Sequence, residues 1–416
     1  MAEPAAAPRE APRCGAGASV EPDLGRALAE AADRARAALS GGAAPDLAVV
    51  FVSAAHGAEV RPALDGLADT LGIRAVIATS AEAVLAGATE YESGPAVTVW
   101  LARLPGAVVE TFALEYSPTP DGGSFVGWPK ALEQGWPEGA GMLVLADPFS
   151  FPVDSFIARM ERDRPGLPIV GGMASAGWTP GSNTLVAGGH LSDCGAVGVV
   201  IGGAARIRPV VSQGCRPIGR PMVITRAEEN VIVELGGRPA LERLREVYAE
   251  IDEADRQLVR SSLHIGRVAS EYQERFKRGD FLVRNVVGAD PDSGVIAVGD
   301  LVRTGQTVQF HVRDAGTAHE DLLHLLAAAA SPAPAGALVF TCNGRGTRLF
   351  SEPHHDARAI QDCLGALPVT GFFAQGEIGP IGKRNFLHGF TASIALVEAA
   401  GAGEAPADDD RPTRAE

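Results

Sequence analysis

The sequence predicts an α/β (α+β) protein of two related lobes, each a mixed β-sheet flanked by helices, packed with pseudo-two-fold symmetry. Apolar runs of strand length alternate with amphipathic helical stretches, a pattern typical of α/β folds. A chain of 416 residues exceeds one ordinary domain. The segment LPIVG at 167–171 recurs as LPVTG at 367–371, so part of the fold is expected twice.

Composition narrows the classes of partner. With 46% hydrophobic and 21% charged residues, the chain has ample material for a core. A formal charge of -15, without a cluster of Lys and Arg, argues against nucleic acid or an anionic membrane as partner. The N-terminus lacks the pattern of a secretory signal, and no segment approaches the ~18 consecutive apolar residues of a membrane span. Five widely spaced cysteines without a CxxC pair fit a reducing compartment, so we expect a cytoplasmic protein.

Local patterns predict the elements of the first half. Residues 1–22 are rich in Ala and Pro, lack apolar periodicity and are expected to be disordered. Segments 95–103 and 107–114 flank Leu-Pro-Gly and predict a β-hairpin. Further elements are expected as strands at 47–53, 73–78 and 142–146, and as helices at about 58–71 and at 153–162, the latter with Pro152 in its first turn.

The second half repeats part of this order. The strand candidate at 143–146 recurs at 338–341, that at 195–201 recurs at 390–397, and the hairpin has a counterpart at 294–314. Segment 236–262 carries apolar residues at helical spacing among charges, and we expect it to be mostly helix, as a scaffold or connector. These matches place the two lobes at 24–203 and 215–398, followed by a disordered acidic tail at 401–416.

The run ALVFTCNGRGTRLF, residues 337–350, predicts a buried strand that opens into Cys342, Asn343, Gly344, Arg345 and Gly346. Glycines after a strand leave backbone N–H groups free for an anion or a carbonyl group. The Arg345 side chain adds a planar donor fork that can hold a carboxylate in bidentate fashion. The alternative is a strand-to-helix turn in which the glycines supply positive φ and Arg345 pairs with an acid.

The segment TGFFAQGEIGPIGKRNFLHG, residues 370–389, holds an isolated Glu377 among glycines. Its first half has a counterpart in LPIVGGMASAG, but that counterpart lacks a glutamate at the position of Glu377. We therefore expect function at Glu377. An amino acid presents both charges, so Arg345 would hold its carboxylate and Glu377 its ammonium group. The alternative is an ion pair between Arg345 and Glu377.

Polar residues close the central strand of each predicted lobe. Asp147 follows the first-lobe strand where Cys342 and Asn343 follow the second. Ligands in α/β layers commonly bind at such strand ends. We expect a pocket between 342–346 and 373–379, with Asp147 and 173–175 forming its other wall or a second pocket.

Other chemistries have weaker support in the sequence. A nucleophilic Cys342 needs a histidine base, and the spacing places none of the histidines beside it. The adjacent His354 and His355 are poorly arranged for a metal ion, and we interpret them as a solvated helix start. The segment GGMASAG lacks the GxGxxG pattern of a dinucleotide site.

These runs resemble a known family. DPFSFPVDSF, LPIVGGMASAG and GAVGVVI resemble the N-terminal part of the FIST sensory domain. FLVRNVVGAD, ALVFTCNGRGTRLF, GFFAQGEIGPIG and FLHGFTASIAL resemble its C-terminal part, so the resemblance covers about 47–398. It implies a signal-transduction sensor of a small ligand such as an amino acid, and some bacterial members resemble haem-binding nitric-oxide sensors. The motif positions carried over are Cys342, Gly344, Arg345, Gly346, Gly371, Gly376, Glu377, Gly379, Asn385 and His388.

The sequence therefore predicts a stand-alone, non-enzymatic cytoplasmic sensor that binds a small ligand and signals to an unidentified protein. We expect no resident cofactor or metal. The alternatives are a haem-based gas sensor with a histidine such as His388 as axial ligand, a Cys342-dependent hydrolase or transferase, and a protein-interaction scaffold. The predicted ligand-binding residues are Cys342, Asn343, Gly344, Arg345, Gly346, Gly376, Glu377, Asn385, His388 and Asp147.

Overall fold

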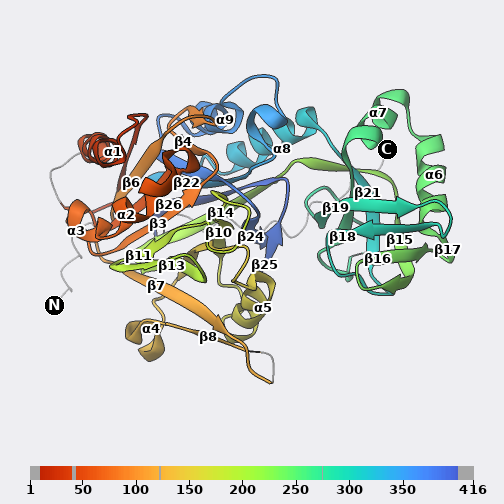
Figure 1. Ribbon diagram of the computed structural model, residues 1–416, viewed down its shortest axis with the longest axis horizontal. Coiled ribbons are helices and arrows are strands. Elements are labelled where there is room, and N and C mark those ends of the chain that lie inside the picture. Colours follow the sequence, from red (N-terminus) through yellow and green to blue (C-terminus); the bar gives the residue numbers. More distant parts are fainter. Residues whose placement is uncertain (1–9, 40–43, 121–122, 274, 402–416) are drawn as a thin grey trace, which may run out of the picture.

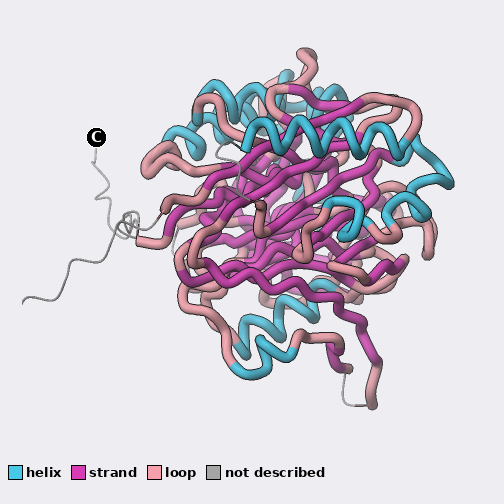
Figure 2. Tube along the Cα trace, turned by 90° about the vertical axis from the view of Figure 1, so that its left-hand side faces the viewer, coloured by secondary structure: helices cyan, strands magenta, loops and turns pink. Residues whose placement is uncertain are grey.

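The structure, a computed structural model, describes residues 10–39, 44–120, 123–273 and 275–401. In this part of the chain, three β-sheets form a main body with helices on its outside (Figure 1, Figure 2). A smaller unit stands at one side of the main body (Figure 1). The predicted α/β class, with mixed sheets flanked by helices, is confirmed. We divide the main body into three units in chain order, called unit 1, unit 2 and unit 3.

Unit 1 begins with a strand that the sequence analysis missed. Residues 13–19 were expected to be disordered, but they pair with the strand at 97–103. This strand contains small residues instead of large apolar ones, because the covering helix lies very close to it. A Cβ on Gly15 would lie 2.2 Å from the Ala35 carbonyl oxygen of that helix. The elements of unit 1 are β1 (Arg13–Ser19), α1 (Leu24–Leu39), β2 (Leu47–Ser53), η1 (Ala54–Glu59), α2 (Val60–Leu64), α3 (Leu67–Leu71), β3 (Val76–Ala81), β4 (Val84–Ala86), β5 (Thr89–Tyr91) and β6 (Val97–Arg103).

Unit 2 starts directly after unit 1. The predicted hairpin of 95–114 is wrong, because β6 pairs with β1 and β2, whereas the next strand pairs within a different sheet. The tight turn between them therefore connects two sheets. The elements of unit 2 are β7 (Ala107–Ser117), β8 (Ser124–Val126), α4 (Lys130–Gln134), β9 (Gly141–Ala146), α5 (Val153–Asp163), β10 (Ile169–Met173), β11 (Leu185–Ala187), β12 (His190–Ser192) and β13 (Ala196–Gly203).

Unit 3 contains the glycine-rich segments of the predicted site. Its chain is interrupted after the first strand by the smaller unit. The elements of unit 3 are β14 (Ala205–Gln213), α8 (Ala315–Ala328), β22 (Gly336–Cys342), η2 (Gly346–Arg348), α9 (His355–Leu364), β23 (Val369–Ala374), β24 (Glu377–Ile381), β25 (Arg384–His388) and β26 (Thr391–Ala399).

The smaller unit, residues 215–313, is a closed antiparallel sheet that we call the insert. Its first strand, residues 215–228, pairs with the strand at 231–235 and with the strand at 307–313, and so closes the sheet into a ring. The chain enters the insert at Cys215 and leaves it at Arg313, which lies opposite Cys215. The predicted helix at 236–262 is two helices, which separate where Asp252 caps the second one through the N–H of Asp255. The elements are β15 (Cys215–Glu228), β16 (Val231–Leu235), β17 (Arg238–Pro239), α6 (Ala240–Glu250), α7 (Glu253–Ser262), β18 (Leu263–Val268), β19 (Phe281–Asp290), β20 (Val295–Val298) and β21 (Thr307–Arg313).

The sheets of the main body share one strand order. Each has the first strand of a unit, its last strand, its two parallel central strands and then a hairpin from another unit; the sheet of unit 2 carries β8 as an additional edge strand beside β7. Hairpin β11–β12 completes the sheet of unit 1, β24–β25 that of unit 2 and β4–β5 that of unit 3. The hairpins are thus exchanged cyclically, which ties the units into one body.

The repeat predicted from 143–201 and 338–397 is confirmed, since these segments form the equivalent strands of units 2 and 3. Unit 1 repeats the order with different residues, so the topology extends the predicted pseudo-two-fold relation to a cyclic three-fold one. The counterpart proposed at 294–314 is wrong, because β20 and β21 belong to the insert and pair with other strands.

Close packing of the central strands explains why glycine recurs in the Leu-Pro-x-x-Gly sequence. The glycines lie where neighbouring strands come too close for a side chain: a Cβ on Gly171 would lie 1.9 Å from the Val144 oxygen, and one on Gly371 would lie 2.0 Å from the Val339 oxygen. The three sheets meet in one apolar centre, where the Phe51 ring contacts the Phe340 ring edge to face at 6.4 Å.

Candidate functional site

The glycine-rich loop of unit 3 begins where β22 ends at Cys342. Gly346 has a φ of 59°, as the structural alternative expected, whereas Gly344 is not in the left-handed region. Glu92, the residue directly after hairpin β4–β5 of unit 1, contacts this loop: the Thr347 N–H and hydroxyl donate to its carboxylate at 2.9 and 2.7 Å. The loop therefore lies between two units.

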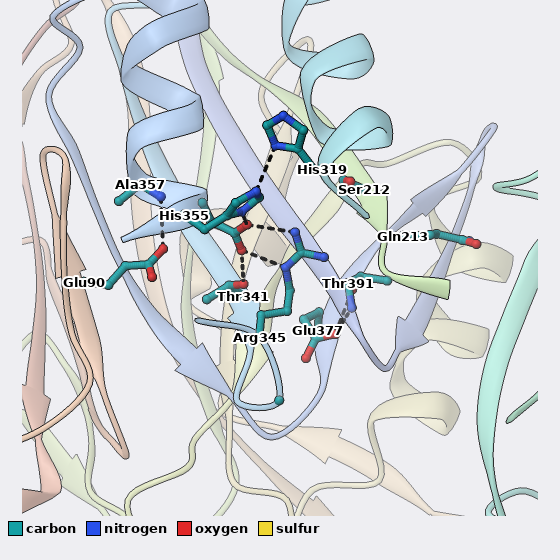
Figure 3. Close-up of polar contacts among 12 residues, drawn as sticks. Glu90, Ser212, Gln213, His319, Thr341, Arg345, His355, Ala357, Glu377 and Thr391 are labelled. Atoms are coloured by element: carbon teal, nitrogen blue, oxygen red, sulfur yellow. Dashed lines mark hydrogen bonds and ion pairs between the residues drawn. The ribbon is translucent and has the colours of Figure 1, made fainter. Parts of the chain in front are cut away.

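Arg345 is fully buried and forms its ion pair with Asp356, the second residue of α9. Its Nε and Nη2 donate to the two Asp356 oxygens at 2.7 and 2.8 Å (Figure 3). The Thr341 hydroxyl donates to the same carboxylate at 2.7 Å. Although burial alone would raise the pKa of Asp356, the Arg345 guanidinium holds it well below its usual range. Asp356 is therefore a charged, buried partner of Arg345, directly after the half-buried His354 and His355.

Two histidines extend this pair toward the surface (Figure 3). A His355 ring nitrogen, Nδ1, lies 2.9 Å from Asp356 Oδ1, and its Nε2 lies 2.9 Å from His319 Nδ1 on α8. The His355 ring also stacks on Phe350 with a centroid distance of 3.4 Å. These contacts fix the start of α9 against α8 and the loop.

Glu377 lies near Arg345 but does not pair with it (Figure 3). Its Oε2 accepts from the N–H and hydroxyl of Thr391 at 3.0 and 2.7 Å. Burial raises the pKa of the Glu377 carboxyl to about 8. Among the described residues, Glu377 Oε1 and Arg345 Nη1 have no hydrogen-bond partner. The neighbouring void, lined by Gln213–Cys215 and Gly389, leaves no room for a water molecule.

A larger pocket opens beside the same loop, and we call it the loop pocket. Its volume is about 380 Å³, within the range of small-molecule sites. It lies between residues 82–93 of unit 1, which include hairpin β4–β5, and the glycine-rich loop of unit 3. The lining residues are Glu82, Ala83, Glu90, Glu92, Ser93, Asn343, Thr347, Arg348, Pro353, His354 and Phe373.

Glu90 is the most unusual group of the loop pocket, because the residue is 4% exposed and its carboxylate is only partly hydrogen-bonded. Its Oε1 accepts from the Ala357 N–H of α9 at 3.0 Å, but its Oε2 has no partner among the described residues. Burial, and next the charge of Asp356, raise the pKa of Glu90 to about 7. An unpartnered buried oxygen costs about 1–3 kcal/mol unless a ligand or water supplies a donor.

The rest of the loop pocket is polar and partly strained. Arg348 pairs with Glu82 and donates to the Asn343 carbonyl at 2.7 Å. His354 has a φ of 67°, which is unusual for a residue with a side chain, and its Nδ1 accepts from the Glu90 N–H at 3.0 Å. Such strain concentrates at functional sites.

The remaining predicted residues have structural partners elsewhere. Asp147 accepts from Asn183 and Ser150 at 2.9 and 2.6 Å and does not line the loop pocket. Asn385 bonds both to the N–H of Ile169 and to the carbonyl of Leu167, which joins β25 to the start of β10. Gly376 accepts from the Met173 N–H at 2.8 Å. Whether these residues bind a ligand stays a prediction.

Cys342 and His388, on which the hydrolase and haem alternatives depend, are both buried. Burial raises the pKa of the Cys342 thiol to about 12, so the thiol is protonated at neutral pH. Its hydrogen bond is to Asn343 Oδ1, at 3.9 Å. His388 Nε2 lies 2.9 Å from the Gly379 carbonyl, and burial lowers the pKa of His388 to about 4.

Sequence reasoning missed the residues that hairpin exchange brings to the loop: Glu82, Glu90 and Glu92. Nothing local marks them, since they meet the loop more than 250 residues later in the chain. The described ranges hold no cluster of three or more His, Cys, Asp or Glu side chains suited to a metal ion, and no helix long and apolar enough to cross a membrane.

Comparison with known proteins agrees with the motif geometry. A family model described as FIST N domain matches residues 46–238, and one described as FIST C domain matches residues 240–380. An uncharacterised protein of Mycobacterium tuberculosis, strain H37Rv, is 44% identical over 392 residues, which cover 92% of this chain and 99% of that protein. An uncharacterised protein of Mycobacterium bovis is 43% identical over 392 residues, covering 92% and 98%. This chain therefore belongs to the FIST family, whose domains are sensory domains of signal transduction.

Proposed function

We propose that this protein is a sensor of a small molecule with a protonated amino group, such as an amino acid, bound in the loop pocket. The observation that carries the proposal is Glu90 Oε2, a buried oxygen that finds no partner in the described part of the chain and lies in a pocket of about 380 Å³. A ligand ammonium group would supply both the missing hydrogen bond and the countercharge. A charge-assisted contact of this kind contributes about 1.5–3 kcal/mol.

The other end of an amino acid also has a partner in the loop pocket. The Arg348 side chain is 55% exposed and pairs with Glu82, whose side chain is 27% exposed. Exposed ion pairs of this kind are weak, so a ligand carboxylate can compete with Glu82 for the guanidinium. Glu90 and Arg348 then bind the two charges of one zwitterion.

The original pair of Arg345 and Glu377 is less suited to a ligand. Arg345 already holds a carboxylate, that of Asp356, and both side chains are fully buried. A ligand between them would have to displace the segments around Gly214 and Phe390, which are joined by the Gly214 N–H to Phe390 carbonyl hydrogen bond of 3.0 Å. The loop pocket needs no such displacement.

The loop also offers a route from the ligand to the insert. Arg313, the last residue of β21, donates through Nη2 to the Gly344 carbonyl. Ser262, at the end of α7, donates to the Arg313 carbonyl at 3.4 Å. A ligand that shifts the loop would thus change how the insert packs against the main body. We propose this change as the output of the sensor.

Titration calorimetry with lysine, leucine, putrescine and acetate tests the ligand class. We expect binding of the three amines and not of acetate, with Glu90→Gln weakening lysine binding by roughly 10-fold or more. Glu377→Gln serves as the matched control, because it neutralises another buried carboxylate near the loop without changing Glu90. Binding lost in Glu377→Gln but kept in Glu90→Gln would move the ligand to the buried Arg345 region and contradict the proposal.

A further inference from the structure

Unit 2 departs from the other units in its first connection. Between the first strand and the first central strand, unit 1 has the 16-residue helix α1 and unit 3 the 14-residue helix α8. The same connection in unit 2 forms a short strand, β8, and a five-residue helix, α4. A departure from the pattern that the fold itself repeats is where function is expected.

The missing helix leaves space beside α5. In unit 3, α8 packs against α9, with Leu322 and Leu326 in one apolar cluster with Ile360. Helix α5 is the equivalent of α9, since each connects the two parallel central strands of its unit. A cavity of about 550 Å³ lies between α5 and the β8–α4 segment, and we call it the aromatic pocket.

Aromatic rings line the aromatic pocket. Trp136 lies 5.8 Å from Trp128 at an interplanar angle of 59°, and Phe125 lies 5.3 Å from Phe156 edge to face. Trp128, Trp136 and Phe125 are only partly buried, and all three line the pocket. Flat, rigid faces at different angles favour a planar ring over a flexible chain.

One cation at the rim is available to a ligand. The Arg164 guanidinium lies 5.1 Å from the centre of the Trp136 ring and, among the described residues, pairs with no carboxylate. The other arginine of the pocket, Arg159, is paired with Asp163. An anionic group on a ring stacked in the pocket would meet Arg164 beside Trp136.

We propose that the aromatic pocket is a second ligand site, which binds a planar aromatic molecule of one to three rings with a carboxylate or a similar anionic group. The ring lies among Trp128, Trp136 and Phe156, and the anion pairs with Arg164. This site is separate from the loop pocket, which lies between units 1 and 3. The proposal does not depend on the amine-binding function.

Tryptophan fluorescence of the full chain tests this site with 2-naphthoate as the probe. The chain has four tryptophans, so Trp178→Phe, which removes the tryptophan that is 67% exposed, gives a cleaner background. We expect saturable quenching in this background. Arg164→Gln should weaken binding about 10-fold, and Trp136→Phe should keep binding with less quenching.

Two controls distinguish binding at this site from nonspecific binding to the protein. Arg162→Gln changes an arginine in the last turn of α5, two residues before Arg164, whose side chain is 72% exposed and outside the pocket, and it should leave the affinity unchanged. The neutral analogue 2-naphthalenemethanol should bind about 10-fold more weakly than naphthoate and be insensitive to Arg164→Gln. Absence of saturable quenching, or equal losses in Arg164→Gln and Arg162→Gln, would overturn the proposal.

Discussion

Glu377 and Leu185 occupy the same register position in two related sheets. Glu377 of β24 lies opposite Gly172, and Leu185 of β11 lies opposite Thr79. Gly172 and Thr79 are equivalent positions of the second central strand, and in the third sheet Val84 lies opposite the equivalent Phe372. The fold is thus built with Leu or Val where unit 3 has a buried carboxylate, so the architecture does not require Glu377.

Glu377 should make stability depend on pH. Its folded-state pKa of about 8 lies above the ordinary 4.5, so the folded protein binds the proton more tightly than the unfolded chain. Stability from this group is complete below pH 4.5 and is lost as pH rises to about 8, by up to ~1.4 kcal/mol per pH unit. Denaturant unfolding at pH 5, 6, 7 and 8 should show Glu377→Gln gaining on the wild type with pH. A constant difference between the two proteins would contradict this assignment.

Asp356→Asn should be strongly destabilising. The substitution leaves the fully buried Arg345 guanidinium without its countercharge, and losses on breaking such pairs are about 3–5 kcal/mol. Guanidinium chloride unfolding followed by circular dichroism gives the difference. Asp193→Asn, which breaks the half-exposed pair with Arg61, is the matched control and should change little. A small effect of Asp356→Asn would mean that the pair does not form in solution.

Amine binding in the loop pocket should strengthen with pH. Because the pKa of Glu90 is raised to about 7, the group is largely protonated at pH 6 and must release its proton to pair with a cation. The affinity for lysine should rise up to about 10-fold per pH unit below pH 7 and level off above it. Calorimetry in buffers of different ionisation enthalpy also counts the released proton. In Glu90→Gln the profile should be flat; a rising profile there would assign the effect to another group.

The insert should fold as an isolated fragment. Its sheet closes through the pairing of β15 with β16, and its ends lie side by side at Cys215 and Arg313. A fragment of residues 215–313 should therefore give a dispersed NMR spectrum and cooperative unfolding. Residues 10–203 alone should not, because their second sheet lacks β24–β25 and their hairpin β4–β5 lacks its sheet. A folded 10–203 fragment would show that the exchanged hairpins are dispensable.

Much of the fold could be predicted because buried strands have local signatures. The strands at 47–53 and 142–146 and the helix at 153–162 are found within a residue or two. The strand at 13–19 could not be recognised, because the closely packed helix leaves room only for small residues, and glycine and alanine lack the apolar pattern of a strand. The exchange of hairpins was also beyond prediction, since pairing between β4 and β23 depends on contacts across the whole chain.

The candidate site divides in the same way. Arg345, Glu377 and Asn343 could be found because a glycine-rich loop after a buried strand is a local pattern. The partner of Arg345 was within ten or so residues, but nothing in the sequence distinguished Asp356 from a solvated helix start. Glu90 could not be found, because its burial comes from α9 of unit 3 and not from its own short hairpin.

The cyclic exchange of hairpins has a consequence for synthesis on the ribosome. The first sheet has all its strands once β12 has emerged, but β10 keeps a bare edge until β24 follows at residues 377–381. Hairpin β4–β5, made early, waits for β23 at residues 369–374. From about residue 173 to residue 369 the nascent chain thus carries two unpaired strand edges, and such edges are where chains aggregate or recruit chaperones. Premature termination between residues 173 and 369 would leave both edges open.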